Sequence, residues 1–332
     1  MEGERKIKAL GLLSGGLDST LAVKLMLDQG IDVVAVKFTS PFCLCDSGGR
    51  CYAAEAAKKF NVPILIVDKG REYLKVLRNP KYGYGSGMNP CIDCRAYMLK
   101  KAKAIARRVG AKFIFTGEVL DERPMSQHFR ALRIIERESG LEGKILRPLS
   151  AKLLPKTEAE RKGWVDRSKL LNIRGRSRRK QMELAKEKGI TDYPCPSGGC
   201  LLTYREFARK VKDLFERRKR ISLNDILLLK VGRHFRLGKN KIIVGRDEAE
   251  NERLMRLKGR HDYVFAVLTC GSPITLLQGP KTKRAIETAA SLTARYSDAK
   301  TDKVLVNYGR DGFENSIEVK RAADEELSKL RI

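Results

Sequence analysis

The chain of 332 residues is poor in histidine, tryptophan and long apolar runs. It has three histidines and one tryptophan, and aromatic residues make up 7% of it. No stretch is apolar over the roughly 20 residues that a membrane-spanning helix needs. The first residues, MEGERKIKAL, are charged and run directly into a candidate strand. We therefore expect no signal peptide, no membrane partner and a cytoplasmic location. We also expect no histidine-based mechanism: His128 could line a site, whereas His234 and His261 are expected at the surface.

Acidic residues are also scarce relative to basic ones. The chain has 40 Asp and Glu against 68 Lys and Arg, which gives a formal net charge of +28. A charge-rich surface of the thermophile type is one explanation, but it relies on paired charges. The surplus here is too large for pairing alone and is typical of proteins that bind a polyanion. The composition therefore predicts a nucleic-acid partner, with RNA favoured.

The segment GLLSGGLDSTLA, residues 11–22, resembles a phosphate-binding loop but lacks the lysine of the Walker pattern. It connects an apolar run at 8–13 to a candidate helix at 19–30. Glycines allow a ligand to approach the backbone closely, and free N–H groups at a helix start favour anions. The alternative is a tight turn in which Asp18 or Ser14 caps the helix. A phosphate site remains plausible, whereas hydrolysis of a γ-phosphate is not expected.

Strand-like and helix-like segments alternate through the first half of the chain, which predicts an open parallel α/β sheet with ligands at its carboxyl edge. The candidate strands are 8–13, 31–38, 62–68 and 111–119, and the candidate helices between them are 19–30, 52–60 and 95–110. Basic helices are expected at 177–189 and 207–220. Further on, strands are expected at 264–270 and 303–309, and a helix at 281–297. The predicted organisation is a catalytic domain (1–170), a basic helical segment carrying CPSGGC (171–220) and a small α+β domain (221–332).

Eight cysteines in a chain expected in the cytoplasm do not indicate a disulfide framework. NPCIDC (89–94) precedes a helix expected to begin near Arg95, where a thiol can have a lowered pKa. CPSGGC ends at Cys200. In one interpretation, Cys91 and either Cys195 or Cys200 form a catalytic pair, in which one thiol carries a persulfide and the other is the resolving thiol. In the other, Cys91, Cys94 and Cys200 bind a 4Fe–4S cluster that keeps one iron open. Zinc or a purely structural role are further alternatives.

A third cysteine group, CLCDSGGRC (43–51), follows the second candidate strand. It is interpreted either as a second metal site formed by Cys43, Cys45 and Cys51 or as loop thiols without a ligand. Three thiols are one short of the four ligands of a structural zinc site.

SGGLDS resembles the SGGxDS signature of the PP-loop, or N-type ATP pyrophosphatase, superfamily. This resemblance implies that the loop binds the pyrophosphate end of ATP together with Mg²⁺, and that AMP is left on a substrate oxygen. It implies that the adenine lies near Lys37 and Phe38, and that Gly117 of TGEV belongs to the same site. The loop residues that it implies as ATP ligands are Ser14, Gly15, Gly16, Asp18 and Ser19, with Asp18 also counted as catalytic.

SGGLDST, NPCIDC, TGEV, RPMSQ, RPLSA and GGCLLT together resemble tRNA thiouridine synthases of the MnmA, ThiI and TtuA kind, over about residues 7–215. The resemblance places Cys91 and Cys200 on the paired catalytic cysteines of that family. It places Cys94 on the additional ligand of cluster-dependent members. Residues 221–332 resemble the NFACT-R type of RNA-binding domain.

The sequence thus predicts an ATP-dependent tRNA sulfurtransferase that adenylates a uracil carbonyl oxygen and replaces it with sulfur. The expected cofactors are ATP, Mg²⁺ and a 4Fe–4S cluster, and the expected sulfur donor is sulfide or a persulfide carrier. One alternative is a PP-loop ligase or amidotransferase that acts on a small molecule. Another is an RNA-binding factor without catalytic activity.

Overall fold

The computed structural model describes residues 6–44, 50–193 and 199–332. It divides into two compact units, Met1–Thr203 and Tyr204–Ile332. The segment predicted as 171–220 is therefore shared between them: residues 171–203 belong to the first unit and 204–220 to the second. The reason lies in packing, since Ala185 and Ile190 are part of the core of the first unit, whereas Asp213 pairs with Arg236 of the second.

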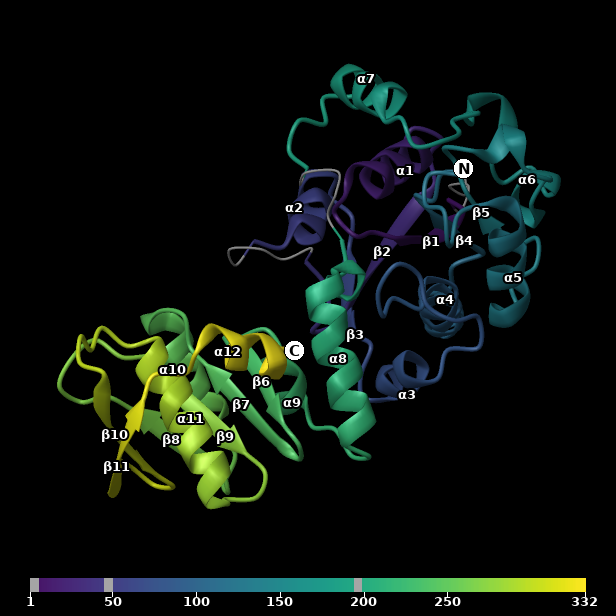
Figure 1. The fold of residues 1–332 in the computed structure, drawn as a ribbon. Coiled ribbons are helices and arrows are strands. Elements are labelled where there is room, and N and C mark those ends of the chain that lie inside the picture. Colours follow the sequence, from purple (N-terminus) through teal and green to yellow (C-terminus); the bar gives the residue numbers. More distant parts are fainter. Residues whose placement is uncertain (1–5, 45–49, 194–198) are drawn as a thin grey trace. The chain divides into compact units, whose positions relative to one another are not determined.

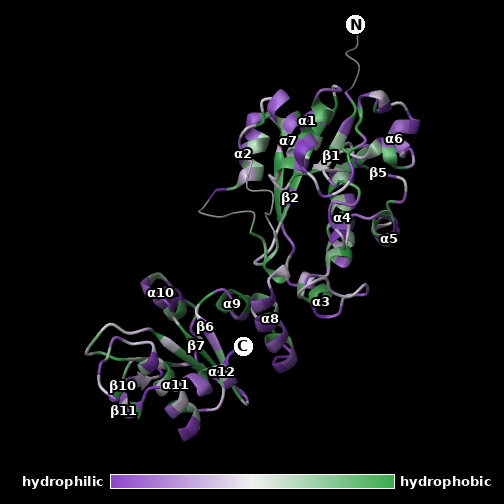
Figure 2. Cartoon of the chain, turned by 45° about the horizontal axis from the view of Figure 1, so that its top comes forward, coloured by the Kyte–Doolittle hydropathy of each residue, from purple (hydrophilic) through white to green (hydrophobic). Residues whose placement is uncertain are grey.

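The first unit is built on a five-stranded parallel sheet with the order β3-β2-β1-β4-β5, as the alternating pattern predicted. Its central strands are apolar runs buried on both faces, which is typical of parallel sheets. The strands are β1 (Lys8–Leu12), β2 (Asp32–Thr39), β3 (Ile64–Asp68), β4 (Phe113–Thr116) and β5 (Ile145–Leu146). In Figure 2, β1 and β2 are coloured largely as hydrophobic.

Helices cover both faces of this sheet (Figure 1). One face packs against α1 (Leu17–Leu27), α2 (Tyr52–Lys59) and α7 (Arg179–Glu187), and the other against α4 (Cys91–Arg108) and α5 (Phe129–Ser139). These helices pack on the sheet because each has an apolar face. In α4, for example, Leu99, Ala102 and Ala106 recur at helical spacing and are buried. Short elements complete the unit: α3 (Glu72–Arg78), α6 (Glu158–Arg161), and the 3₁₀ turns η1 (Ala151–Leu153), η2 (Arg167–Lys169) and η3 (Leu201–Thr203).

The second unit is an antiparallel sheet with the order β11-β10-β8-β9-β7-β6 and helices packed against it, which confirms the predicted α+β class. Its helix α11 (Lys283–Arg295) contributes a row of buried alanines to the core. The strands are β6 (Arg233–Leu237), β7 (Asn240–Val244), β8 (Tyr263–Ala266), β9 (Thr275–Gln278), β10 (Lys303–Gly309) and β11 (Asn315–Lys320). The other helices are α8 (Arg205–Arg217), α9 (Leu223–Leu228), α10 (Glu248–Leu257) and α12 (Asp324–Leu330).

One expectation about this unit is wrong. His234 was expected at the surface, but it is buried, with Nε2 2.8 Å from the carbonyl oxygen of Val231. It occupies an inward position of β6 next to Phe235, a placement that one isolated histidine in a basic stretch does not reveal.

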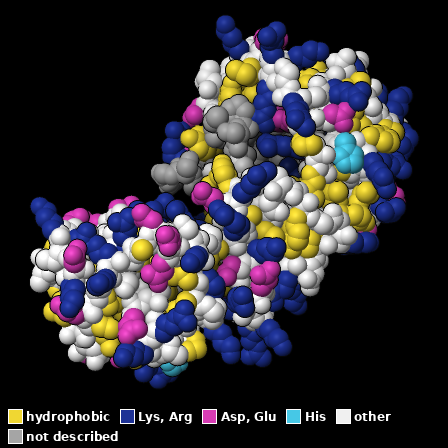
Figure 3. Space-filling view, viewed as in Figure 1, with side chains coloured by type: hydrophobic (Ala, Val, Ile, Leu, Met, Phe, Trp, Pro, Cys, Tyr) yellow, Lys and Arg dark blue, Asp and Glu magenta, His cyan; other side chains and the backbone are white. Residues whose placement is uncertain are grey.

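Lys and Arg side chains are distributed over both units on the face drawn in Figure 3. None of the helices in the described ranges has the length and apolar character needed to cross a membrane.

Candidate functional site

The glycine-rich loop lies between the carboxyl end of β1 and the first turn of α1, and its own hydroxyls hold it in shape. The Ser19 hydroxyl donates to the carbonyl oxygen of Gly16 at 2.9 Å and accepts from the Ser14 backbone N–H at 3.2 Å. The Oγ atoms of Ser14 and Ser19 are 3.0 Å apart. The loop therefore presents a fixed set of hydroxyls and N–H groups at a helix start, which suits an anion.

Two glycines of this region leave no room for a side chain. Gly15 has φ +83°, and a Cβ there would lie 2.4 Å from the backbone nitrogen of Ala53. A Cβ on Gly117, directly after β4, would lie 2.5 Å from the backbone of Ser19. Both glycines thus permit close approach of the backbone: Gly15 to the start of α2, and Gly117 to the phosphate loop.

Asp18 faces a pair of side chains from distant parts of the chain. Arg178 donates to Glu122 at 2.6 Å, and its Nη2 lies 3.7 Å from Oδ2 of Asp18. Burial, followed by the negative charge of Glu122, raises the pKa of Asp18 to about 6, and Arg178 opposes this rise. Oδ1 of Asp18 is buried without a hydrogen-bond partner. The two carboxylates next to the phosphate loop are oxygen ligands of the kind that bind divalent cations.

Lys37 and Phe38, the expected neighbours of the adenine, lie in β2. Lys37 is buried, and its Nζ lies 3.2 Å from Sγ of Cys51, which directly precedes α2. Phe38 packs against the core on the other face of the sheet. The adenine position that the resemblance implies therefore remains a prediction.

The first cysteine pair lies inside a helix rather than before it. The helix α4 begins at Cys91, so that Cys91 and Cys94 both lie in its first turn, although the helix was expected to begin near Arg95. The Asn89 side-chain amide donates to Sγ of Cys91 at 3.2 Å. Burial raises the pKa of the Cys91 thiol, against the opposing hydrogen bond from Asn89. The lowered pKa that a helix start can give to a thiol is therefore not found at Cys91.

Cys200 reaches the same region through a short backbone pairing with Cys43. The two residues form an antiparallel bridge, flanked by hydrogen bonds from Leu44 N–H to the carbonyl of Gly199 (3.2 Å) and from Leu201 N–H to the carbonyl of Phe42 (2.9 Å). Burial raises the pKa of the Cys200 thiol to about 12, with the charges of Cys94 and Cys43 adding to the effect. Cys195 and Cys45 lie outside the described residues.

A negative charge on Cys94 contributes to raising the pKa of both Cys91 and Cys200, after the larger effect of burial. Within residues 6–44, 50–193 and 199–332, no group of three Cys, His, Asp or Glu side chains could hold a single metal ion as arranged. A 4Fe–4S cluster needs a different arrangement of ligands from a single ion. Each thiolate binds a different iron, so the thiolates lie farther apart than the ligands of one ion. Cys91, Cys94 and Cys200 are half-buried thiols, and thiolates are the ligands that hold iron–sulfur clusters, so the donor set has the chemistry that a cluster needs.

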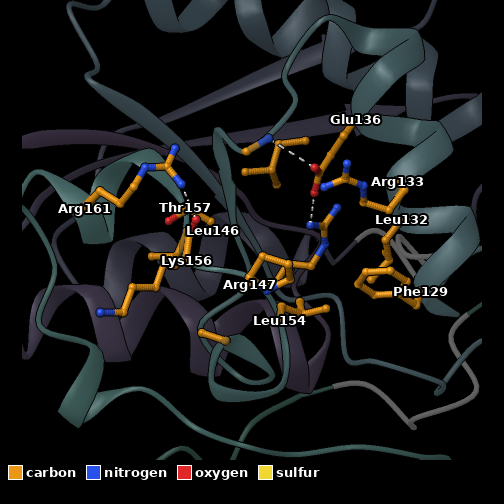
Figure 4. Close-up of a pocket in the computed structure, with 14 residues that line it drawn as sticks. Phe129, Leu132, Arg133, Glu136, Leu146, Arg147, Leu154, Lys156, Thr157 and Arg161 are labelled. Carbon is orange, nitrogen blue, oxygen red and sulfur yellow. Dashed lines mark hydrogen bonds and ion pairs between the residues drawn. The ribbon is translucent and has the colours of Figure 1, made fainter.

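A buried charge network connects the nucleotide edge of the sheet to the cysteine helix. Glu118, next to Gly117, accepts from Arg147 at 3.0 Å and lies 3.6 Å from Arg95, the residue after Cys94. Arg147 also donates to Glu136 at 2.5 Å (Figure 4). Burial alone would raise the pKa of Glu118, but the charges of Arg147 and Arg95 outweigh it and hold that pKa below its usual value. Glu118 therefore stays ionised between the two sites.

A cavity of about 120 Å³ lies beside this network, lined by α5 and the residues that follow β5 (Figure 4). Phe129, Arg133, Leu154 and Arg161 are among its lining residues. None of the predicted site residues lines it. The chemistry proposed below is therefore not assigned to this cavity.

Sequence analysis assigned no site role to three residues that the structure brings close to the predicted site residues: Glu118, Glu122 and Arg178. Glu118 lies within TGEV, which was noted for its glycine only. Arg178 lies in a basic stretch, and nothing in that stretch distinguishes it from its neighbours.

Two family models match the chain. Residues 5–152 match the model described as thiamine biosynthesis protein (ThiI), and residues 232–331 match the NFACT protein RNA binding domain. The predicted resemblances of the first and second units are thereby confirmed. Tyr204 opens the second unit, so the RNA-binding match falls entirely within it.

Curated relatives also match the chain. A probable tRNA sulfurtransferase from Thermococcus kodakarensis is 31% identical over 145 residues, which cover 43% of this chain and 36% of that protein. A tRNA-specific 2-thiouridylase MnmA from Tropheryma whipplei is 31% identical over 141 residues, 38% of this chain and 39% of the relative. The chain thus spans little more than a third of the length of these relatives.

A solved structure also resembles the chain. A 4-thiouridine synthetase in complex with RNA and bound ATP aligns with a TM-score of 0.40 at 21% identity, covering 67% of this chain and 52% of that one.

Proposed function

We propose that the chain is an ATP-dependent tRNA sulfurtransferase that converts a uridine to a thiouridine. The proposal is supported by the positions of the phosphate loop, the TGEV segment and Cys43, each of which follows the carboxyl end of a strand of the parallel sheet. The Ser14–Ser19 loop follows β1, Gly117 and Glu118 follow β4, and Cys43 follows β2. Ligands of open α/β sheets bind at this edge.

In the first step, a uracil carbonyl oxygen attacks the α-phosphorus of ATP, and pyrophosphate leaves. The hydroxyls of Ser14 and Ser19 and the N–H groups at the start of α1 would bind the departing pyrophosphate. Such preorganised donors stabilise charge as it develops. Asp18 would hold Mg²⁺, with Glu122 beside it.

In the second step, sulfur adds to the activated carbon, and AMP leaves with the original oxygen. Cys91, Cys94 and Cys200 would hold a 4Fe–4S cluster, which supplies an iron able to bind sulfide. Sulfide is the donor for this route. In the alternative route, Cys91 accepts the outer sulfur of a persulfide carrier; after this sulfur has attacked the activated carbon, Cys200 releases the product by forming a disulfide with Cys91, which an external thiol reduces.

The substrate is proposed to be tRNA, supported by the net charge of +28 and by the RNA-binding match of residues 232–331. Contacts with phosphates make affinity fall steeply with salt. A tRNA substrate implies a cytoplasmic location.

The test is anaerobic turnover of the full chain with Mg²⁺–ATP, sulfide and unmodified tRNA. We expect AMP and pyrophosphate to form only when tRNA is present, and the digested tRNA to contain a thiouridine. Formation of AMP without tRNA would instead favour a small-molecule ligase. Salt-sensitive tRNA binding without pyrophosphate release would favour a non-catalytic RNA-binding factor.

A further inference from the structure

The cavity between α5 and the segment after β5 takes no part in the proposed chemistry, and its walls are largely apolar. Its volume of about 120 Å³ is close to the roughly 150 Å³ of a cavity that holds one benzene ring. Leu132, Leu146 and Leu154 contribute to the walls. Phe129, the first residue of α5, also lines the cavity and is 49% exposed. The cavity therefore has room for one aromatic ring, with an exposed aromatic side chain beside it.

The same cavity carries a surplus of positive charge. Arg133 lies on one side of it, and Lys156 and Arg161 lie on the other (Figure 4). All three side chains are exposed, and no carboxylate of the described residues lies within 4 Å of their charged groups. Glu136 also lines the cavity, but it is paired with Arg147. Arginine and lysine side chains of this kind bind phosphate groups, so the charge fits a ligand that carries phosphates.

Arg147 supplies a hydrogen-bond donor to the cavity wall. Its side chain is 3% exposed, and two of its nitrogens donate to Glu118 and Glu136. Its third nitrogen, Nη2, is buried without a hydrogen-bond partner. A buried donor without a partner costs free energy, which an acceptor on a ligand would recover. The ring carbonyl oxygens of a pyrimidine base are acceptors of this kind.

The cavity lies a short distance along the sheet from the phosphate loop. Strand β5 is two positions from β1 in the sheet, Arg147 directly follows β5, and the phosphate loop follows β1. Neighbouring strands lie about 4.8 Å apart, so the carboxyl ends of β1 and β5 are about 10 Å apart. About three nucleotides of a stacked strand cover that distance. An RNA strand with a uridine at the phosphate loop can therefore place a nearby base in the cavity.

We propose that this cavity binds a pyrimidine base of the RNA substrate, a few nucleotides from the uridine that reacts. This inference rests on the proposed tRNA substrate. The base stacks on Phe129 and accepts a hydrogen bond from Nη2 of Arg147. Arg133, Lys156 and Arg161 contact the phosphates on either side of it. A purine has two fused rings and is larger than the cavity.

The test measures the affinity of the full chain for a fluorescein-labelled uridine decamer by fluorescence anisotropy. Wild type is compared with Phe129→Ala and Arg161→Gln and with one control for each. Leu223→Ala is the control for Phe129→Ala, since Leu223 is also the first residue of a helix, is 54% exposed and lies outside the RNA-binding match. Arg107→Gln removes the same charge as Arg161→Gln, but in the last turn of α4, at the amino edge of the sheet. Thermal unfolding verifies that each variant is folded.

We expect Phe129→Ala to bind the uridine decamer about tenfold more weakly, because a base-stacking contact is lost. We expect Arg161→Gln to reduce the slope of log affinity against log salt concentration by about 0.7, because one phosphate contact is lost. Leu223→Ala and Arg107→Gln should match the wild type in both measurements. An adenosine decamer should bind the wild type more weakly, and Phe129→Ala should change its affinity less.

Equal affinities of Phe129→Ala and Leu223→Ala for the uridine decamer would overturn the inference. Equal losses for the uridine and adenosine decamers in Phe129→Ala would overturn the assignment to a pyrimidine. An equal loss for a glutamate decamer would indicate an acidic peptide as the ligand instead. Displacement of the decamer by uridine monophosphate at the same concentration would indicate a free nucleotide.

Failure of the proposed function has a different signature, namely no AMP formed by the wild type in the presence of tRNA. Binding of the decamer requires neither ATP nor sulfur transfer. Decamer binding and AMP formation are therefore separate readouts, and the two failures can be told apart.

Discussion

Arg178 lies beside Asp18, with Nη2 of the arginine 3.7 Å from Oδ2 of the aspartate, although the two residues are far apart in the sequence. The contact forms because α7 packs on α1 in the first unit. Arg178 also pairs with Glu122, so one guanidinium contacts two acids at the start of the phosphate loop. This arrangement neutralises only part of the charge around Asp18, whose pKa stays raised at about 6.

Replacing Asp18 by Asn is expected to stabilise the nucleotide-free protein at pH 7.5 by about 2 kcal/mol. The folded-state pKa of about 6 lies above the ordinary value of 3.8, so ionisation of Asp18 costs stability. That cost is absent below the lower pKa, grows as the pH rises between the two values and is complete above about 6. The gain from Asn should therefore be smaller at pH 5 than at pH 7.5.

Urea unfolding, monitored by tryptophan fluorescence, measures the stability gain of the Asp18→Asn variant in the first unit. Trp164 is the only tryptophan, and it stacks on Phe113 in the first unit. A stability gain that is the same at both pH values would contradict the prediction. The variant should also lose pyrophosphate release, since the carboxylate proposed to hold Mg²⁺ is gone.

Gly15→Ala is expected to destabilise the first unit and to weaken ATP binding. The residue has φ +83°, and its new Cβ would meet the backbone of Ala53 at 2.4 Å. Gly30→Ala is the matched control, because Gly30 has φ +76° but nothing within 4 Å of a Cβ. Backbone strain alone costs of order 1 kcal/mol, which both variants share.

The difference in stability between Gly15→Ala and Gly30→Ala measures the cost of the close contact between the new Cβ and the backbone of Ala53. We expect Gly15→Ala to lose clearly more stability than Gly30→Ala in urea unfolding, and to be alone in its reduced ATP affinity in equilibrium dialysis. Equal losses in the two variants would mean that the loop can move away from α2 without cost.

Cys94→Ser is expected to abolish iron binding in anaerobically reconstituted protein. Cys94 is one of the three proposed cluster ligands, so its loss leaves only Cys91 and Cys200 to bind iron. Cys270→Ser is the control, since Cys270 packs against the core of the second unit. Iron and sulfide analysis with an optical spectrum measures the effect, and full iron content in Cys94→Ser would exclude the proposed ligand set.

Lys241→Met is expected to stabilise the second unit at pH 7 by about 2 kcal/mol or more. Lys241 is 5% exposed, and burial lowers its pKa from 10.5 to about 7, against the charge of Asp213. The unfolded chain therefore binds more protons than the folded one between these pH values. The cost of the lysine is full below pH 7 and disappears as the pH rises towards 10.5.

Scanning calorimetry at pH 7 and pH 9.5 tests this prediction, with Lys239→Met as the control. Lys239 lies two positions away in the turn between β6 and β7 and is exposed. The gain in melting temperature should be confined to Lys241→Met and should shrink at pH 9.5. A destabilised Lys241→Met would indicate that the ammonium has a stabilising role in the folded state.

The sequence predicted the elements that form the sheet, because their signals are local. Strand β1 is a short apolar run, Gly30 follows the end of α1, and β2 is rich in β-branched residues. Alternation of such segments dictates a parallel sheet, and a loop after β1 must then lie at its carboxyl edge. The phosphate loop and the class of both units were therefore predictable from the sequence.

The sequence could not place the start of α4, because the segment before it lacks a residue that usually caps the start of a helix. Pro90 occupies the N-cap position and has no side-chain cap, so the usual start signal is absent. The result is that Cys91 and Cys94 share the first turn of the helix and are half-buried, and burial raises the pKa of Cys91.

What the sequence by itself determined is the set of chemical groups: a phosphate loop, clustered thiols and a large basic surplus. Only the tertiary structure decided which of these groups meet. Lys69 contacts Cys94, and Arg178 contacts both Asp18 and Glu122, although nothing in the local sequence pairs these residues. The physical reason is that burial and long-range charge depend on how helices and strands pack, whereas hydrophobic periodicity depends only on near neighbours in the chain.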